Sequence, residues 1–318
     1  MGELIAVVDL GTNSTRLLVA RVGRDGTVDE IDRRTDVTRL GEGVDATGRL
    51  SDEATQRVHD TLASYRESAD RHGAERRVAV ATSAVRDAEN GAAFTEAVTN
   101  RHGFDVRVIS GEEEARLTFL GATSGRDRAA GEVLVFDIGG GSTEFVVGAP
   151  GETPGFHVST RLGSVRQTER HIRSDPPRAE EMAALSDATA AVIAAAVPER
   201  VSGDVRAGIA VAGTATSLAA IDQRLDPYDP ARVHGYGLTL SAAERMLSRL
   251  AAMPLVERRE LPGLLPARAP TIVAGAVILV ESMRAFGLEL VEVSEADILH
   301  GTAMDAVLYG GDNGGTMG

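Results

Sequence analysis

Short runs of aliphatic and β-branched residues, each bounded by turn residues, recur along the chain and predict β-strands. The expected strands are 4–8, 15–22, 28–37, 78–84, 105–110, 133–137, 143–147, 155–160, 207–212 and 288–293, the fourth with an ambiguous end. Several of these runs are almost wholly apolar, which is typical of strands buried on both faces. The chain is therefore expected to build extended sheets that helices cover.

Apolar residues at helical spacing predict the helices between these strands. The clearest follows Ser51, a good N-cap residue, and its apolar positions repeat from Ala54 to Ala69 before Gly73 ends it. Further helices are expected at 92–101, 112–120, 179–197, 241–252, 271–286 and 296–308. Strands that alternate with helices indicate an α/β fold.

One strand–turn–strand pattern occurs twice, 128 residues apart. IAVVDLGTNSTRLLVA begins at Ile5, and VLVFDIGGGSTEFVVG begins at Val133. Asp9 corresponds to Asp137, and Arg16 stands where Glu144 stands. The repeat predicts two related α/β halves, with a ligand site expected in the cleft between them.

The polar segment 123–132 lies where a domain boundary is expected. The predicted domains are 1–124 and 125–300, and a final helix at about 301–309 is expected to pack back on the first. The tail, 310–318, has almost no apolar content and is expected to be disordered.

Composition excludes several function classes. The 318 residues carry 47 acidic and 33 basic side chains, a net charge of −14, which argues against nucleic-acid and anionic-membrane partners. The chain has no cysteine, and every basic residue is arginine, so thiolate chemistry and a lysine-dependent Walker A loop are excluded. The apolar run at 271–283 is too short to span a bilayer, and a cytoplasmic protein is expected.

Both repeated turns are suited to binding phosphate, because glycine-rich turns expose several backbone N–H groups in one concavity. The expected phosphate-binding residues are Gly11, Thr12, Asn13, Ser14, Gly139, Gly140, Gly141, Ser142 and Thr143.

The residues that differ between the two copies predict different roles. Arg16 is a cation suited to an anion, whereas Glu144 is an acid suited to a hard cation. Asp9 and Asp137 each end a buried strand, where a carboxylate needs a partner or a metal. We therefore expect Mg²⁺, with Mn²⁺ possible, on Asp137 and Glu144 with Asp9 as a further ligand.

Six motifs together make a resemblance specific. DLGTNSTRLLVAR, ATSAVRDAENG, ISGEEEARLTFLG, FDIGGGSTEFVVG, RLGSVRQTER and VAGTATSLAA occur in the order and spacing of the exopolyphosphatase/guanosine pentaphosphate phosphohydrolase family, Ppx/GppA. The chain resembles the short form of this family, which lacks the HD-type extension. The resemblance implies two ribonuclease-H-like domains of the actin, sugar kinase and heat-shock chaperone superfamily around a central cleft.

The resemblance also implies residues and an activity. Glu114 aligns with the catalytic glutamate of the family, and Arg86 with an arginine expected to contact the phosphate chain. The implied enzyme is a hydrolase of phosphoric anhydrides, an exopolyphosphatase. The alternative is the guanosine pentaphosphate 5′-phosphohydrolase of the stringent response, and a non-catalytic polyphosphate or alarmone binding protein is a weaker reading. A homodimer is expected from the family alone.

Two segments keep two readings each. The junction 211–220 corresponds to the adenosine-side loop of the superfamily, or is only a tight strand–helix connection. Arg161, Arg166, Arg170 and Arg173 could line a channel for a polyanion, or could form one solvated helix face.

Overall fold

The computed structural model describes residues 2–126, 131–205 and 207–310. These residues form two compact units, Met1–Asp127 with Ala296–Gly318, and Arg128–Glu295. The chain therefore passes between the units three residues later than the predicted division at 124, and returns five residues earlier than the predicted boundary at 300. Of the tail predicted to be disordered, all but Gly310 lies outside the described residues.

The first unit contains a five-stranded sheet in the order β3-β2-β1-β4-β5. Strands β1 (Glu3–Leu10), β2 (Thr15–Val22) and β3 (Val28–Asp36) are antiparallel neighbours. Strands β4 (Arg76–Ala81) and β5 (Asp105–Val108) extend the sheet in parallel with β1. The carboxyl ends of β1 and β4 therefore lie at the same edge, beside the first glycine turn.

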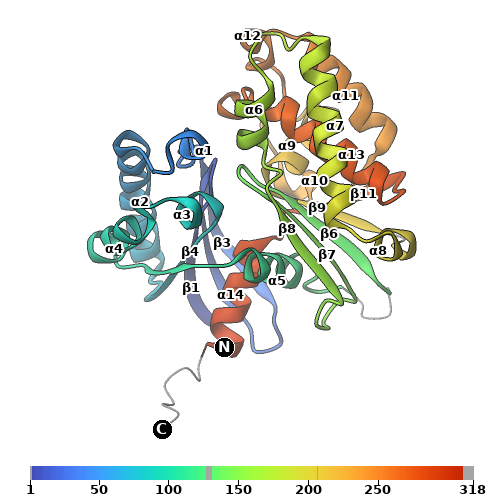
Figure 1. Cartoon of the computed structure of the whole chain (residues 1–318). Helices are drawn as coiled ribbons and strands as arrows, with labels where there is room; N and C mark the ends of the chain where they lie inside the picture. The colour runs from blue at the N-terminus through green and yellow to red at the C-terminus, as the bar shows by residue number, and fades with distance from the viewer. Residues whose placement is uncertain (1, 127–130, 206, 311–318) are drawn as a thin grey trace. The chain divides into compact units, whose positions relative to one another are not determined.

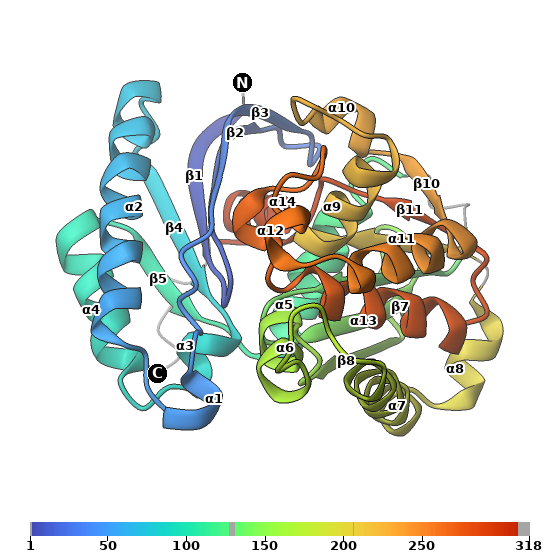
Figure 2. The same ribbon diagram turned by 90° about the horizontal axis from the view of Figure 1, so that it is seen from above.

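Helices cover both faces of this sheet. They are α1 (Val44–Thr47), α2 (Asp52–His72), α3 (Ser83–Asp87), α4 (Gly91–His102), α5 (Gly111–Ala122) and α14 (Ile298–Tyr309). Ser51 Oγ accepts the Ala54 N–H at 3.1 Å, and Gly73 ends α2 with a φ of 74°. Figure 2 shows α2 and α4 together on one side of the sheet.

The last helix belongs to the first unit, where it packs against α5 and β1 (Figure 1). Two glycines allow the close contact between α5 and α14. A Cβ atom at Gly121 would collide with the backbone at Asp297, and one at Gly301 would collide with the carbonyl of Leu117. Leu299 and Ala303 of α14 are fully buried against Ile5, Val7 and Leu18 of the sheet.

The second unit contains a six-stranded sheet in the order β10-β11-β9-β6-β7-β8. The strands are β6 (Val133–Ile138), β7 (Thr143–Gly148), β8 (Phe156–Thr160), β9 (Gly208–Val211), β10 (Tyr236–Thr239) and β11 (Leu290–Val293). Strands β6, β7 and β8 are antiparallel, and β9 lies parallel to β6. The arrangement of β6 to β9 thus repeats that of β1 to β4.

The second unit contains the helix α13 (Ile272–Ala285), of which twelve residues are buried. The others are α6 (Ser164–His171), α7 (Ala179–Ala196), α8 (Glu199–Asp204), α9 (Ala212–Asp222), α10 (Pro230–Val233), α11 (Leu240–Ala252) and α12 (Leu255–Arg258). Helices α7 and α11 both contact α13, as Figure 1 shows. Among the described residues, no helix combines the length and the apolar character needed to cross a membrane.

Candidate active site

The first glycine turn, between β1 and β2, is closed by the Gly11 N–H, which donates to the Ser14 carbonyl at 3.1 Å. A segment that follows β3 holds the outside of the turn. The Gly41 N–H donates to the Thr12 carbonyl at 2.8 Å, and the Arg39 N–H donates to the Asn13 carbonyl at 2.9 Å. The predicted phosphate-binding residues of this turn therefore have two of their carbonyls fixed by backbone donors.

Asp9 and Arg16 stand opposite each other in the β1–β2 register. Arg16 donates to Asp9 Oδ2 from Nε at 2.9 Å and from Nη2 at 2.7 Å, and its Nη1 bonds to Asp297 Oδ2. Burial raises the pKa of Asp9, although Arg16 acts in the opposite direction. Arg16 thus links the end of β1 to the start of α14.

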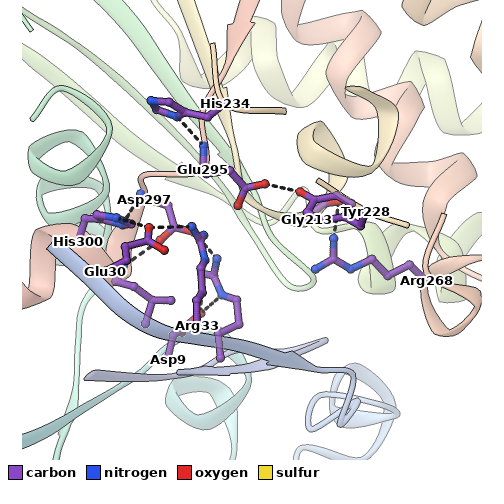
Figure 3. A network of polar contacts seen from close by, with 12 residues as sticks. Asp9, Glu30, Arg33, Gly213, Tyr228, His234, Arg268, Glu295, Asp297 and His300 are labelled. Carbon is purple, nitrogen blue, oxygen red and sulfur yellow. Dashed lines mark hydrogen bonds and ion pairs between the residues drawn. The ribbon is translucent and has the colours of Figure 1, made fainter. Parts of the chain in front are cut away.

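Asp297 was not predicted as a site residue. It caps α14 by accepting the Leu299 N–H at 3.0 Å, and Figure 3 shows it beside Arg33 and His300. Burial acts to raise its pKa, but Arg16, Arg33 and His300 together lower that pKa below its usual value. In the sequence, Asp297 falls in the first turn of the helix predicted at 296–308, which gives no indication of Arg16 as a partner; the observed helix begins one residue after Asp297.

The second glycine turn, between β6 and β7, repeats the closing bond, with the Gly139 N–H donating to the Ser142 carbonyl at 3.0 Å. Its outer side is held by α6. The Ser164 N–H donates to the Gly139 carbonyl at 2.9 Å, and the Val165 N–H donates to the Gly140 carbonyl at 2.9 Å. The two predicted phosphate loops therefore share one construction, a hairpin turn backed by the segment after the third strand.

Asp137 and Glu144 stand opposite each other in the β6–β7 register, where the first unit has Asp9 and Arg16. Only 6% of Asp137 and 1% of Glu144 is exposed. Ser159 Oγ donates to Glu144 Oε1 at 2.7 Å. Two buried carboxylates on neighbouring strands repel each other, so this pair is suited to a bound cation.

The predicted metal ligands fit Mg²⁺ in part. Within the described residues no group of three or more acidic, histidine or cysteine side chains could hold a metal ion. Mg²⁺ is, however, commonly held by one or two carboxylates together with water and substrate phosphate. Asp137 and Glu144 can supply that protein share, whereas Asp9 already accepts two hydrogen bonds from Arg16.

Glu114 and Arg86 meet in the first unit. Glu114 lies in the first turn of α5 and is 7% exposed. Arg86, from α3, donates from Nη1 to Glu114 Oε2 at 3.2 Å and to the Ile109 carbonyl at 2.8 Å. The residue predicted to act on water and the residue predicted to contact phosphate therefore share an ion pair.

The junction between β9 and α9 is packed tightly. Arg268 donates from Nη1 to the Gly213 carbonyl at 2.7 Å and to Ser217 Oγ at 3.1 Å, as Figure 3 shows for Gly213. A Cβ atom at Gly213 would collide with the Arg268 guanidinium. These contacts fix Arg268 on the segment and fit both readings of it, the adenosine-side loop and the strand–helix connection.

Relatives of the chain carry phosphatase names. It is 36% identical over 312 residues to Exopolyphosphatase 2 of Mycobacterium tuberculosis, covering 94% of this chain and 97% of that protein. It is 33% identical over 290 residues to Exopolyphosphatase 1 of Mycobacterium bovis, covering 91% and 84%.

Solved structures agree with this relationship. A Ppx/GppA family member from Aquifex aeolicus is 32% identical with a TM-score of 0.80, covering 98% of this chain and 99% of that one. An exopolyphosphatase from Cytophaga hutchinsonii is 26% identical with a TM-score of 0.86, covering 96% and 99%. With the repeated sheet topology, they confirm the predicted fold class.

Residues 18–309 match the Ppx/GppA phosphatase family. The predicted enzyme class, a hydrolase of phosphoric anhydrides, is confirmed by this match together with the named relatives. The chain belongs to the Ppx/GppA phosphatase family.

Proposed function

We propose that this protein is an exopolyphosphatase, which removes the terminal phosphate of inorganic polyphosphate by in-line attack of water. The observation that carries the proposal is the pair Asp137 and Glu144, buried opposite each other beside a glycine turn whose carbonyls are held by α6. The exopolyphosphatase names of relatives at 36% and 33% identity support polyphosphate as the substrate.

The proposal gives each group one task. Glu114 orients the attacking water and accepts its proton, the role that a carboxylate can fill in phosphoryl transfer. The turns at 11–14 and 139–143 donate N–H groups to phosphate oxygens. Mg²⁺, or Mn²⁺, held by Asp137 and Glu144 would neutralise charge on the phosphate oxygens.

Arg86, which is expected to contact the phosphate chain, also positions Glu114 in this proposal. Its ion pair fixes the orientation of the Glu114 carboxylate, because the same Nη1 is anchored on the Ile109 carbonyl at 2.8 Å. A guanidinium so placed keeps further N–H groups with which to contact a phosphate oxygen. Homodimer formation and a cytoplasmic location stay predictions.

The test is phosphate release with Mg²⁺ from polyphosphates of several lengths, guanosine pentaphosphate and ATP. We expect polyphosphate to give the highest kcat/KM. Glu114→Gln should lower kcat by about 10²- to 10⁴-fold, the usual contribution of a general base. Glu112→Gln, in the same turn of α5 but exposed, is the matched control and should stay near wild type.

Two results would contradict the proposal. A higher kcat/KM for guanosine pentaphosphate would make the protein a guanosine pentaphosphate phosphohydrolase. Full phosphate release by Glu114→Gln would remove Glu114 from the catalytic machinery.

A further inference from the structure

Arg166 is a buried cation at the back of the second glycine turn. It is the third residue of α6, it is only 5% exposed, and its Nε donates to the Gly141 carbonyl at 2.8 Å. The reading of Arg166 as part of a solvated helix face is therefore wrong. The next arginine on the helix, Arg170, is exposed and matches the solvated reading.

With the hydrogen bond from Arg166, three successive carbonyls of the second glycine turn accept hydrogen bonds from α6. The first turn of α6 gives N–H groups to the carbonyls of Gly139 and Gly140, and the Arg166 side chain takes the third carbonyl, that of Gly141. A Cβ atom at Gly163 would collide with the backbone of Gly140 and Gly141, so α6 lies directly against the turn. Three successive carbonyls are thus held from one side.

The direction of these carbonyls sets the direction of the N–H groups. In a planar trans peptide the N–H of one residue points opposite to the carbonyl of the residue before it. With the carbonyls of 139, 140 and 141 turned toward α6, the N–H groups of Gly140, Gly141 and Ser142 point away from the helix. Successive N–H groups on one side of a turn form a concavity suited to an anion.

Of the three carbonyls, only the last depends on a side chain. A free carbonyl at Gly141 could rotate with its peptide plane, because a glycine-flanked peptide has wide conformational freedom. Such a rotation would turn the Ser142 N–H out of the concavity and present a carbonyl oxygen to the phosphate. A charge-assisted hydrogen bond from a buried guanidinium opposes that rotation.

We propose that Arg166 is a positioning residue that acts through the Gly141 carbonyl and keeps the second glycine turn in its phosphate-binding form. The inference rests on the proposed function in one respect, that this turn receives the phosphoryl group. Arg166 itself contacts the back of the turn, not the substrate.

Three substitutions separate the hydrogen bond from the charge. In Arg166→Gln the side-chain N–H₂ comes at the same number of bonds from the backbone as Nε, so the bond to Gly141 can persist without the charge. Arg166→Lys keeps a charge but places its nitrogen one bond further out. Arg166→Met removes both.

Positioning predicts a specific order of activities. Arg166→Gln should keep most of the wild-type kcat for phosphate release, while Arg166→Met should lose about 10- to 100-fold, as for other residues that orient a functional group. Arg166→Lys should fall between them. The loss should appear in both kcat and KM, because the turn binds the phosphoryl group, and Arg170→Met on the same helix should match the wild type.

Other orders overturn the inference. If Arg166→Lys keeps activity and Arg166→Gln loses it, the charge matters and the bond does not. Equal losses in Arg166→Met and Arg170→Met would indicate a polyanion channel, and a lowered melting temperature with unchanged kcat would indicate a purely structural role. If Arg166→Met does not fold, the relative kcat values of Arg166→Gln and Arg166→Lys still show whether the hydrogen bond or the charge is required.

A second measurement does not need turnover. Calorimetric titration with inorganic phosphate and Mg²⁺ should show wild-type affinity in Arg166→Gln and weaker binding in Arg166→Met. If the wild type releases no phosphate from any substrate, the proposed function fails while this binding comparison still tests the turn. Equal phosphate affinity in all variants would refute the positioning role.

Discussion

The two glycine turns are the same hairpin with opposite charge beside it. Each closes with a glycine N–H on a serine carbonyl, and each is backed by the segment after the third strand. In the first unit the aspartate faces Arg16, whereas in the second it faces Glu144. The first pair joins opposite charges, whereas the second joins two carboxylates, for which a bound cation is part of the proposed function.

The supports behind the turns differ as well. The carbonyl of Asn13 accepts a backbone N–H from Arg39, while the corresponding carbonyl of Gly141 accepts the side chain of Arg166. A substitution at Arg166 can remove the hydrogen bond to the Gly141 carbonyl, whereas a side-chain substitution at Arg39 leaves its backbone N–H in place. The two turns therefore share one shape but differ in how the third carbonyl is held and in the charge beside them.

The largest expected effect is on stability in the first unit. Arg16→Met leaves Asp9 and Asp297 buried without their shared guanidinium, which should lower the free energy of unfolding by about 3–5 kcal/mol. Arg21→Met, an exposed position on the same strand, is the control and should cost little. Urea denaturation measures both, and equal stability of the two variants would contradict the assigned role of Arg16.

The same variant has a defined pH dependence. In the wild type the pKa of Asp297 is lowered, so its pairing stabilises the fold above its ordinary value of 3.8 and is lost as pH falls further. Arg16 lowers the pKa of both carboxylates, so its removal should raise both pKa values, and the folded variant should bind protons more tightly than the folded wild type. The difference in the free energy of unfolding between Arg16→Met and the wild type, measured by urea denaturation, should therefore become smaller from pH 7 to pH 4.5.

The next effect is on activity in the second unit. Glu144→Gln has nearly the same shape but removes the charge that distinguishes this turn from the first. We expect kcat/KM for phosphate release to fall by about 10²- to 10³-fold, comparable to losing an electrostatic group in other active sites. The Mg²⁺ concentration at half-maximal activity should rise, and unchanged Mg²⁺ dependence would argue against a metal on Glu144.

The smallest effect compares the two supporting glycines. A Cβ atom at Gly163 would collide with the backbone of the turn, whereas one at Gly41 would collide with the end of the Thr12 side chain and lie tightly against the Ala84 Cβ atom. Gly163→Ala should therefore cost about 1–3 kcal/mol of stability and lower activity, since the turn itself must shift. Gly41→Ala should cost less, because Thr12 can rotate at the expense of its hydrogen bond to Ser83. A smaller loss of stability in Gly163→Ala than in Gly41→Ala would contradict this difference between the two turns.

Local chemistry was sufficient to predict much of the fold. Ser51 and Gly73 bound α2 as expected, because capping and left-handed termination depend on a few adjacent residues. Strand β2 begins and ends at the predicted residues, since its apolar run is bounded by turn residues on both sides. The two glycine turns at 11–14 and 139–143 could also be predicted, because each is defined by a few adjacent glycine, serine and threonine residues between two apolar runs.

Contacts between distant residues could not be predicted in this way. The arginine spacing in α6 predicts a helix face but not that Arg166 is buried, since burial depends on a turn 25 residues earlier in the chain. Asp297 meets Arg16 across 281 residues, and no periodicity links them. Site residues held by such contacts become visible only in the folded chain.

The attachment of α14 to the first unit has a consequence for the order of synthesis. The ribosome completes the second unit, 128–295, before it makes Asp297 and the helix that follows. Until then the sheet lacks the cover of Leu299 and Ala303, and Arg16 lacks one of its carboxylates. The unit that is translated first therefore receives α14 only after the second unit has been made, and α5, which carries Glu114, can pack against α14 only then.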